Sequence, residues 1–262
     1  MIITAEIGAS HDGSLERALS TIRHAAMSGA DAVKFQTWTP DRMEVGGRYL
    51  DSGPWKGWSL KDLYAKAWTP WEWFPALINE AKECGLEWWS TPFDLESIHF
   101  LEELDCPRYK IASFELIDLP LISAAAHTGK PLILSTGMAT FDEIRDAVMQ
   151  IPRGSDITLL KCVSSYPALP KDYNLLAMKD LGANFWCKVG LSDHTKGITV
   201  PVVAAAMGAS MIERHITVSR ELGLDDSFAS DPDEFADMVA AVKLALDSMG
   251  EAVYGPTERE KP

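Results

Sequence analysis

The sequence predicts a parallel (β/α)8 TIM barrel. Short apolar runs alternate with longer segments whose apolar residues recur at helical spacing, as strands and helices do in a βα repeat. Eight such runs occur, which is the number of strands in this barrel. The length of 262 residues also suits one barrel. We therefore expect residues 1–262 to form a single domain.

The expected strands follow one another along the whole chain. They are Ile2–Ile7, Ala32–Phe35, Leu86–Trp89, Arg108–Ile111, Leu132–Leu134, Ile157–Leu160, Trp186–Val189 and Ser210–Ile212. Helical spacing is clearest in Leu15–Met27, Pro75–Cys84 and Asp142–Met149. Asp231-Pro232 predicts the start of a closing helix, because Asp233 and Glu234 would then lie in its first turn. A doubly wound open sheet is the alternative, but no Gly-x-Gly-x-x-Gly follows the first strand.

Composition and charge limit the classes of partner. The net charge of −14 argues against nucleic acid or an anionic membrane as the main partner, although a local basic cluster can still bind an anionic substrate. No apolar stretch is long enough to span a membrane, and the N-terminus lacks the basic region of a signal peptide. The four cysteines form no Cys-x-x-Cys, which favours reduced thiols in a cytoplasmic protein.

One segment, Thr39–Trp73, is long for a connection between a strand and a helix. It contains five tryptophans together with several glycine and proline residues. Long loops at the carboxyl ends of barrel strands often form lids or substrate walls. The alternatives are a structured loop whose tryptophans cover the barrel rim, and an apolar dimer surface.

Polar residues follow the expected strands, at the end of a barrel where ligands bind. Lysines, small hydroxyl residues and glycines recur there, and these groups bind phosphate. They include Lys34, Ser90, Thr91, Lys110, Ser113, Ser135, Gly137, Lys161, Ser164 and Ser192. A buried lysine paired with a carboxylate is the alternative at each position. The recurrence favours a phosphorylated ligand, and Glu6 and Glu115 add carboxylates for substrate hydroxyls or proton transfer.

Two histidines lie in the stretch Val189–His215. If this stretch folds as strand, helix and strand, His194 and His215 follow neighbouring strands at the same edge. Two imidazoles with carboxylates nearby are able to hold a divalent metal and leave positions open for substrate. The alternative is that each histidine is a partly buried polar residue bonded to a neighbour, because two ligands alone are a weak signature.

Eight stretches of the chain together resemble the sialic acid synthase family, whose members condense phosphoenolpyruvate with an N-acetylated aminosugar. The stretches are AEIGASHDGS, GADAVKFQT, STPFD with FLEEL, YKIAS with Glu115, GKPLILSTGMAT, CVSSYP, VGLSDHT, and IERHIT followed by Asp226, Ala229 and Ser230. They run from residue 3 to about residue 235, in the family's order. Every expected strand carries one of them.

The resemblance implies a role for each matching residue. His194 and His215 match the ligands of a divalent metal, usually Mn²⁺, with Mg²⁺ or Co²⁺ as alternatives. The positions around phosphoenolpyruvate are Lys34, Thr91, Lys110, Ser113, Ser135, Ser164 and Ser192. The positions that line the sugar are Glu6, Gln36, Glu115, Tyr166 and Asp226. The residues expected to be catalytic are Glu115, Lys110, Glu6 and Asp226.

The resemblance also implies a reaction. The metal polarises the aldehyde of an open-chain sugar, phosphoenolpyruvate attacks it, and a 2-keto-3-deoxy sugar acid and phosphate result. N-acetylmannosamine or a related aminosugar is the expected acceptor. The alternatives are a non-N-acetylated or phosphorylated aldose, and a barrel that binds a sugar or phosphoenolpyruvate without turnover.

The sequence departs from the family pattern mainly on the sugar side. Family members usually carry a C-terminal antifreeze-like (SAF) domain that caps the partner's site in a dimer, and we expect no such domain here. A homodimer and a separate cap-domain protein are therefore further partners that the sequence allows. Phe114 replaces a common glycine, Ser10 a common asparagine and Lys161 a common histidine. Asp225 and Asp226 both fit the position of the sugar-contacting acid, and we place it at Asp226.

Overall fold

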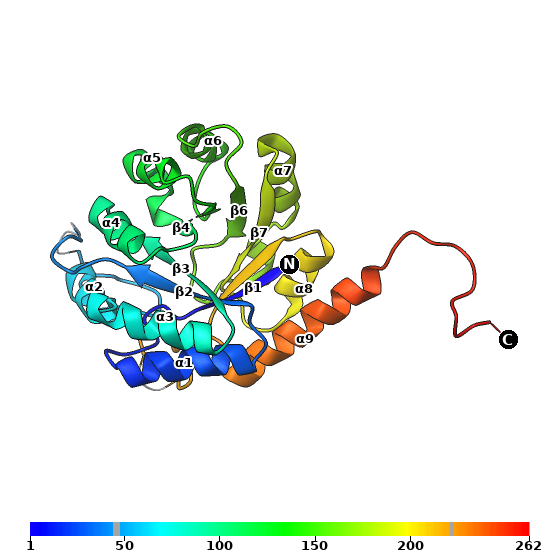
Figure 1. Cartoon of the computed structure of the whole chain (residues 1–262), viewed down its shortest axis with the longest axis horizontal. Helices are drawn as coiled ribbons and strands as arrows, with labels where there is room; N and C mark the ends of the chain where they lie inside the picture. The colour runs from blue at the N-terminus through cyan, green and yellow to red at the C-terminus, as the bar shows by residue number, and fades with distance from the viewer. Residues whose placement is uncertain (44–47, 221–222, 262) are drawn as a thin grey trace.

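The computed structural model describes residues 1–43, 48–220 and 223–261, and its strands form a closed parallel barrel surrounded by helices (Figure 1). The strands are β1 (Ile2–Glu6), β2 (Ala32–Thr37), β3 (Glu87–Pro92), β4 (Tyr109–Ile111), β5 (Leu132–Ser135), β6 (Ile157–Cys162), β7 (Lys188–Asp193) and β8 (Met211–His215). Each strand pairs with the next along the chain, and β8 pairs with β1. The predicted (β/α)8 TIM barrel is confirmed.

Helices fill the connections and cover the outside of the barrel (Figure 1). They are α1 (Leu15–Met27), α2 (Leu60–Ala67), α3 (Phe74–Glu83), α4 (Leu95–Glu103), α5 (Leu119–His127), α6 (Phe141–Met149), α7 (Leu176–Phe185), α8 (Thr199–Ala206) and α9 (Pro232–Met249), with the 3₁₀ helices η1 (Trp71–Trp73), η2 (Phe114–Ile117) and η3 (Pro170–Asp172). In α1 the buried residues Ala18, Ile22 and Ala25 recur at helical spacing and pack into the hydrophobic core. In the part of the chain that is described, no helix is both long and apolar enough to cross a membrane.

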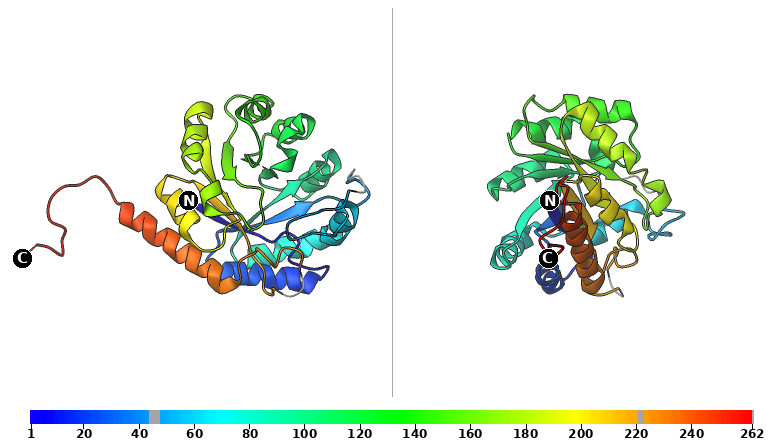
Figure 2. Two further views of the ribbon diagram at one scale, coloured as in Figure 1. Left: turned by 180° about the vertical axis from the view of Figure 1, so that it is seen from behind. Right: turned by 90° about the vertical axis from the view of Figure 1, so that its right-hand side faces the viewer.

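The closing helix begins where the sequence predicts it. Asp231 accepts a hydrogen bond from the amide of Glu234 at 2.9 Å, and the Glu234 side chain accepts one from the amide of Asp231 at 3.2 Å. This reciprocal cap satisfies amide groups that the first turn of a helix leaves free. Helix α9 then packs beside α8 and α1 and completes the outer ring (Figure 2).

The seventh strand begins two residues later than predicted. Helix α7 continues to Phe185, and Trp186 takes a left-handed conformation with φ of 51°, which ends the helix. Strand β7 therefore runs from Lys188 to Asp193, and Ser192 belongs to the strand itself. The tryptophan-rich segment Thr39–Trp73 is not one loop, because it contains α2 and η1. Its residues 44–47 lie outside the described residues.

Strand register brings several polar residues to one level at the carboxyl end of the barrel. Glu6 on β1 lies opposite Lys34 on β2 and opposite His215 on β8. Ser192 on β7 lies opposite Glu213 on β8. Residues directly opposite each other in a sheet point to the same face. These side chains consequently converge inside the barrel.

Candidate active site

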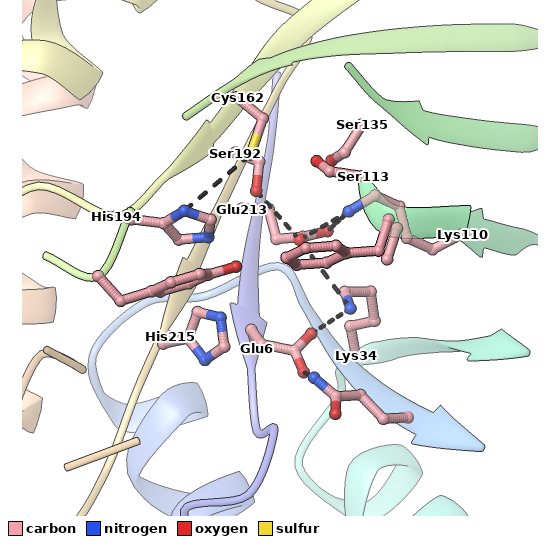
Figure 3. Close-up of a pocket in the computed structure, with 14 residues that line it drawn as sticks. Glu6, Lys34, Lys110, Ser113, Ser135, Cys162, Ser192, His194, Glu213 and His215 are labelled. Atoms are coloured by element: carbon pink, nitrogen blue, oxygen red, sulfur yellow. Dashed lines mark hydrogen bonds and ion pairs between the residues drawn. The ribbon is translucent and has the colours of Figure 1, made fainter. Parts of the chain in front are cut away.

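A pocket opens at the carboxyl ends of the strands (Figure 3). Barrel enzymes carry their active sites at this end. The pocket is lined by Glu6, Lys34, Gln36, Lys110, Ala112, Ser113, Phe114, Ser135, Cys162, Tyr166, Ser192, His194, Glu213 and His215. Most of the predicted site residues are among them, including both lysines and both histidines. Figure 3 shows the histidines on one side of the pocket and the lysines on the other.

The floor of the pocket consists of buried ion pairs. Lys110 Nζ lies 2.8 Å from Oε1 and 3.0 Å from Oε2 of Glu213. Lys34 Nζ forms an ion pair with Glu6 and donates to Thr91 Oγ1 at 3.0 Å. It also lies 3.9 Å from Glu213 Oε1. Glu213 therefore connects the two lysines.

Lys34 and Lys110 are both buried, but their pKa values shift in opposite directions because they have different numbers of carboxylate partners. Burial disfavours the charged form, but Glu213 and Glu6 outweigh it at Lys34 and raise the pKa of that amine. Lys110 pairs with Glu213 alone, so burial prevails and lowers its pKa. Burial also opposes the charge of Glu213, yet Lys110 and Lys34 hold the pKa of its carboxyl at about 2. Two cations face two carboxylates, and the floor by itself is close to neutral.

Each of the two histidines is oriented by a hydrogen-bond acceptor at its Nδ1 atom. His194 Nδ1 lies 2.8 Å from the carbonyl oxygen of Val163, and His215 Nδ1 lies 3.1 Å from Oδ2 of Asp225. The ring centroids are 5.6 Å apart. A carbonyl or a carboxylate only accepts, so each Nδ1 carries a hydrogen, and in the neutral ring each Nε2 keeps its lone pair. This tautomer and this outer support are those of metal-binding histidines.

The pair fits a divalent metal with open positions. Within residues 1–43, 48–220 and 223–261, no group of three or more His, Cys, Asp or Glu side chains converges as a metal site. The protein would therefore supply the two Nε2 atoms, and water and substrate would supply the rest.

A cradle of hydroxyls surrounds Gly137 beside the lysines. The amide of Gly137 donates to Ser113 Oγ at 3.1 Å, and a Cβ at this position would lie only 2.7 Å from that oxygen. The buried hydroxyls of Ser135 and Ser164 have no hydrogen-bond partner among the described residues. Buried polar groups without partners are rare and often mark where a ligand binds. Hydroxyl donors, close backbone and nearby lysines suit a phosphate or carboxylate.

Glu115 lies in η2, next to the pocket-lining Phe114 but not itself part of the lining. Its Oε2 atom is buried and has no hydrogen-bond partner among the described residues. Burial raises the pKa of Glu115 to about 7. A carboxyl group with this pKa is able both to give and to take a proton near neutral pH.

Replacing Glu115 by glutamine should change how stability depends on pH. Glu115 binds its proton more tightly in the folded protein than in the unfolded chain, whose value lies near 4.5. Its stabilising contribution is therefore complete below about pH 4.5 and is lost as the pH rises to about 7. Between pH 5 and pH 8 we expect the wild type to lose about 2–3 kcal/mol more unfolding free energy than Glu115→Gln. Urea unfolding at the two pH values measures this difference, and parallel losses would contradict the shifted pKa.

Comparison with known proteins agrees with this geometry. A family model described as the NeuB family matches residues 21–254. This chain belongs to the NeuB family. Pseudaminic acid synthase of Helicobacter pylori is 44% identical over 256 residues, which cover 95% of this chain and 75% of that protein. N,N'-diacetyllegionaminic acid synthase of Legionella pneumophila is 37% identical, covering 99% of this chain and 76% of that protein.

Solved structures of the NeuB type have the same barrel. The N-acetylneuraminic acid (sialic acid) synthetase of Leptospira borgpetersenii, solved in complex with citrate, superposes with a TM-score of 0.88 at 34% identity. The match covers 99% of this chain and 88% of that one. The chain is thus an enzyme of the sialic acid synthase type.

One predicted site residue of this NeuB-family chain lies elsewhere. Asp226 was expected to line the sugar, but its carboxylate binds Arg17 Nη2 at 2.8 and 2.9 Å and Thr217 Oγ1 at 2.7 Å. It holds the loop after β8 against α1, and it is not among the pocket-lining residues. The preceding residue, Asp225, contacts His215 instead. Asp225 therefore supports His215, although it is not itself among the pocket-lining residues.

Three further predicted residues lie just behind the pocket lining. Thr91 supports Lys34, Ser164 lies against Gly137, and Glu115 flanks Phe114. Conversely, the predicted set lacked Glu213 and Cys162, which both line the pocket. The signal for Glu213 was present in the sequence, because it lies two residues before His215 and so points to the same face of β8.

Proposed function

We propose that this NeuB-family enzyme condenses phosphoenolpyruvate with an aldose to give a 2-keto-3-deoxy sugar acid and inorganic phosphate. The observation that carries the proposal is the division of one pocket into two halves. Lys34, Lys110 and the hydroxyl cradle around Gly137 form an anion-binding half, and His194 and His215 form the opposite half. A condensation needs both an anchored nucleophile and a site that polarises an aldehyde.

Phosphoenolpyruvate suits the anion-binding half because it carries a phosphate and a carboxylate. The hydroxyls of Ser135 and Ser164 supply donors, and Lys34 and Lys110 supply charge. The lysines are already paired with Glu6 and Glu213, so the floor offers little net positive charge. A divalent cation on the histidine side would balance the charge of the bound substrate.

His194 and His215 would hold that metal, with Mn²⁺ as the first choice and Mg²⁺ or Co²⁺ as alternatives. When bound, it would supply Lewis-acid polarisation of the acceptor aldehyde. Glu6 accepts from Gln36 Nε2 at 2.9 Å and pairs with Lys34, so its carboxylate is fixed where it is able to orient an acceptor hydroxyl. Tyr166 also lines the pocket, and its ring lies against that of His194.

The reaction balances with one water molecule. C3 of phosphoenolpyruvate forms a bond to the aldehyde carbon, and the aldehyde oxygen takes a proton from Glu115. Water then adds at C2 and returns a proton to Glu115. The bond between C2 and the bridging oxygen breaks, the C2 hydroxyl gives its proton to the departing phosphate, and the ketone forms at C2. Glu115 suits this exchange because its pKa of about 7 makes both transfers accessible at neutral pH.

The acceptor is an aldose whose product resembles sialic acid. The relatives named above make pseudaminic acid and N,N'-diacetyllegionaminic acid. Removing the three carbons that phosphoenolpyruvate contributes from such a product gives the aldose. N-acetylmannosamine and the two aldoses obtained in this way therefore form the first panel. Non-N-acetylated and phosphorylated aldoses form the second panel.

Release of phosphate from phosphoenolpyruvate tests the proposal. The enzyme is incubated with Mn²⁺ and each aldose, with and without a chelator. We expect chelator-sensitive release with an aldose of the first panel. Release only with the second panel would keep the reaction and change the acceptor. Tight binding of phosphoenolpyruvate without release for any aldose would contradict the proposed reaction and favour a binding barrel.

A further inference from the structure

Residues 48–59, which precede α2, reach across the mouth of the barrel. Strands β2 and β6 lie on opposite sides of the closed ring. Trp55 follows β2, yet its ring centroid lies 5.4 Å from that of Tyr166, which follows β6. A contact between loops from opposite strands requires one of them to pass over the opening. Because Tyr166 lines the pocket, Trp55 reaches the wall of the active site.

This segment has its own internal structure. The amide of Leu50 donates to the carbonyl of Trp58 at 2.9 Å, and the amide of Gly57 donates back to Leu50 at 2.8 Å. Tyr49 and Ser59 form an antiparallel bridge at its base. Gly53 and Gly57 have φ of 78° and 88°, which allows the tight turn that carries Trp55. Residues 48–59 thus form a hairpin-like strap with Trp55 near its tip.

Trp55 is held at both its polar and its apolar edge. Its Nε1 donates to the carbonyl of Leu224, in the loop after β8, at 3.0 Å. Its ring meets Phe228 edge to face at 5.7 Å. Tyr166 in turn lies 4.2 Å from the ring of His194, and Phe228 lies 5.1 Å from that of His215. A continuous set of ring contacts therefore connects the strap to the two histidines.

We propose that residues 48–59 form a strap across the acceptor side of the pocket and that Trp55 is a positioning residue, which fixes Tyr166 and Phe228 beside His194 and His215. This inference rests on the proposed condensation for its link to the acceptor. The existence of the strap is argued from contacts within the structure and does not depend on the proposed condensation.

Three variants separate the parts of this proposal. Trp55→Ala removes the ring contacts and the hydrogen bond, and we expect the KM for the acceptor to rise roughly tenfold. The KM for phosphoenolpyruvate should stay within about twofold, because the lysines and hydroxyls lie on the other side of the pocket. Trp55→Phe keeps a ring but loses the bond to Leu224, so an intermediate rise of roughly threefold is expected. Trp58→Ala is the control, since Trp58 lies in the same strap with its side chain exposed.

Hydrogen exchange gives a second readout that needs no turnover. The amides of Asp226 and Phe228 are bonded within the loop after β8, and Trp55→Ala should speed their exchange severalfold, whereas Trp58→Ala should not. Unchanged exchange in Trp55→Ala would overturn the strap. Faster exchange with both KM values raised equally would overturn the acceptor role. If no aldose supports turnover in the wild type, the proposed function fails, and the exchange result still decides whether the strap exists.

Discussion

Lys110→Met is expected to abolish phosphate release and to destabilise the barrel in one step. Lys110 is buried, and both oxygens of Glu213 lie within 3.0 Å of its amine. Methionine fills a similar volume but leaves Glu213 with Lys34, at 3.9 Å, and with the neutral hydroxyl of Ser192, at 3.4 Å. Breaking a buried ion pair by removing one partner costs about 3–5 kcal/mol, because the remaining charge is uncompensated. Urea unfolding and the phosphate assay measure the two effects.

The double variant Lys110→Met with Glu213→Gln separates stability from chemistry. It removes both charges and leaves the pair of Lys34 and Glu6 balanced. We expect it to recover most of the lost stability, because a buried ion pair replaced by neutral groups costs little. Phosphate release should remain absent, since the charge proposed to hold phosphoenolpyruvate is still missing. A single variant as stable as the wild type would instead mean that Lys34 alone compensates Glu213.

The fold was predictable from the sequence because each strand and helix of a parallel barrel has a local signature. Apolar runs and helical spacing identify the elements without knowledge of what lies opposite them. The same locality explains why Lys34, Lys110, His194 and His215 were expected at the rim, where they line the pocket. Each lies at or just after the carboxyl end of a strand, and the fold brings all strand ends to one rim.

The parts of the site that depend on long-range pairing could not be predicted in this way. Asp225 and Asp226 are consecutive, and only the contact of Asp226 with Arg17 on α1 decides which of them faces His215. Likewise, the reach of Trp55 to Tyr166 depends on the path of the strap across the barrel. Neither contact can be inferred from the hydrophobic periodicity or the local composition of the sequence.

His215→Ala should reduce phosphate release roughly a thousandfold while leaving the barrel folded. The loss is large because one of the two proposed histidine ligands disappears. The unfolding free energy should change by less than about 1 kcal/mol, since His215 lies at the rim and Asp225 keeps its bond to the amide of Ala9 at 2.9 Å. Calorimetric titration with Mn²⁺ gives the metal affinity directly, and His127→Ala, an exposed histidine on α5, is the control.

Asp225→Asn should have a smaller effect than His215→Ala, because it leaves both imidazoles in place. The amide is still able to accept from Ala9 but supports the His215 ring less strongly than a carboxylate does. Losing such an outer partner typically lowers metal affinity by about 10–100-fold. Mn²⁺ affinity should therefore fall from the wild type through Asp225→Asn to His215→Ala, and phosphate release should fall in the same order. Full turnover in His215→Ala would remove the metal from the mechanism and leave aldehyde activation to Glu115 and the lysines.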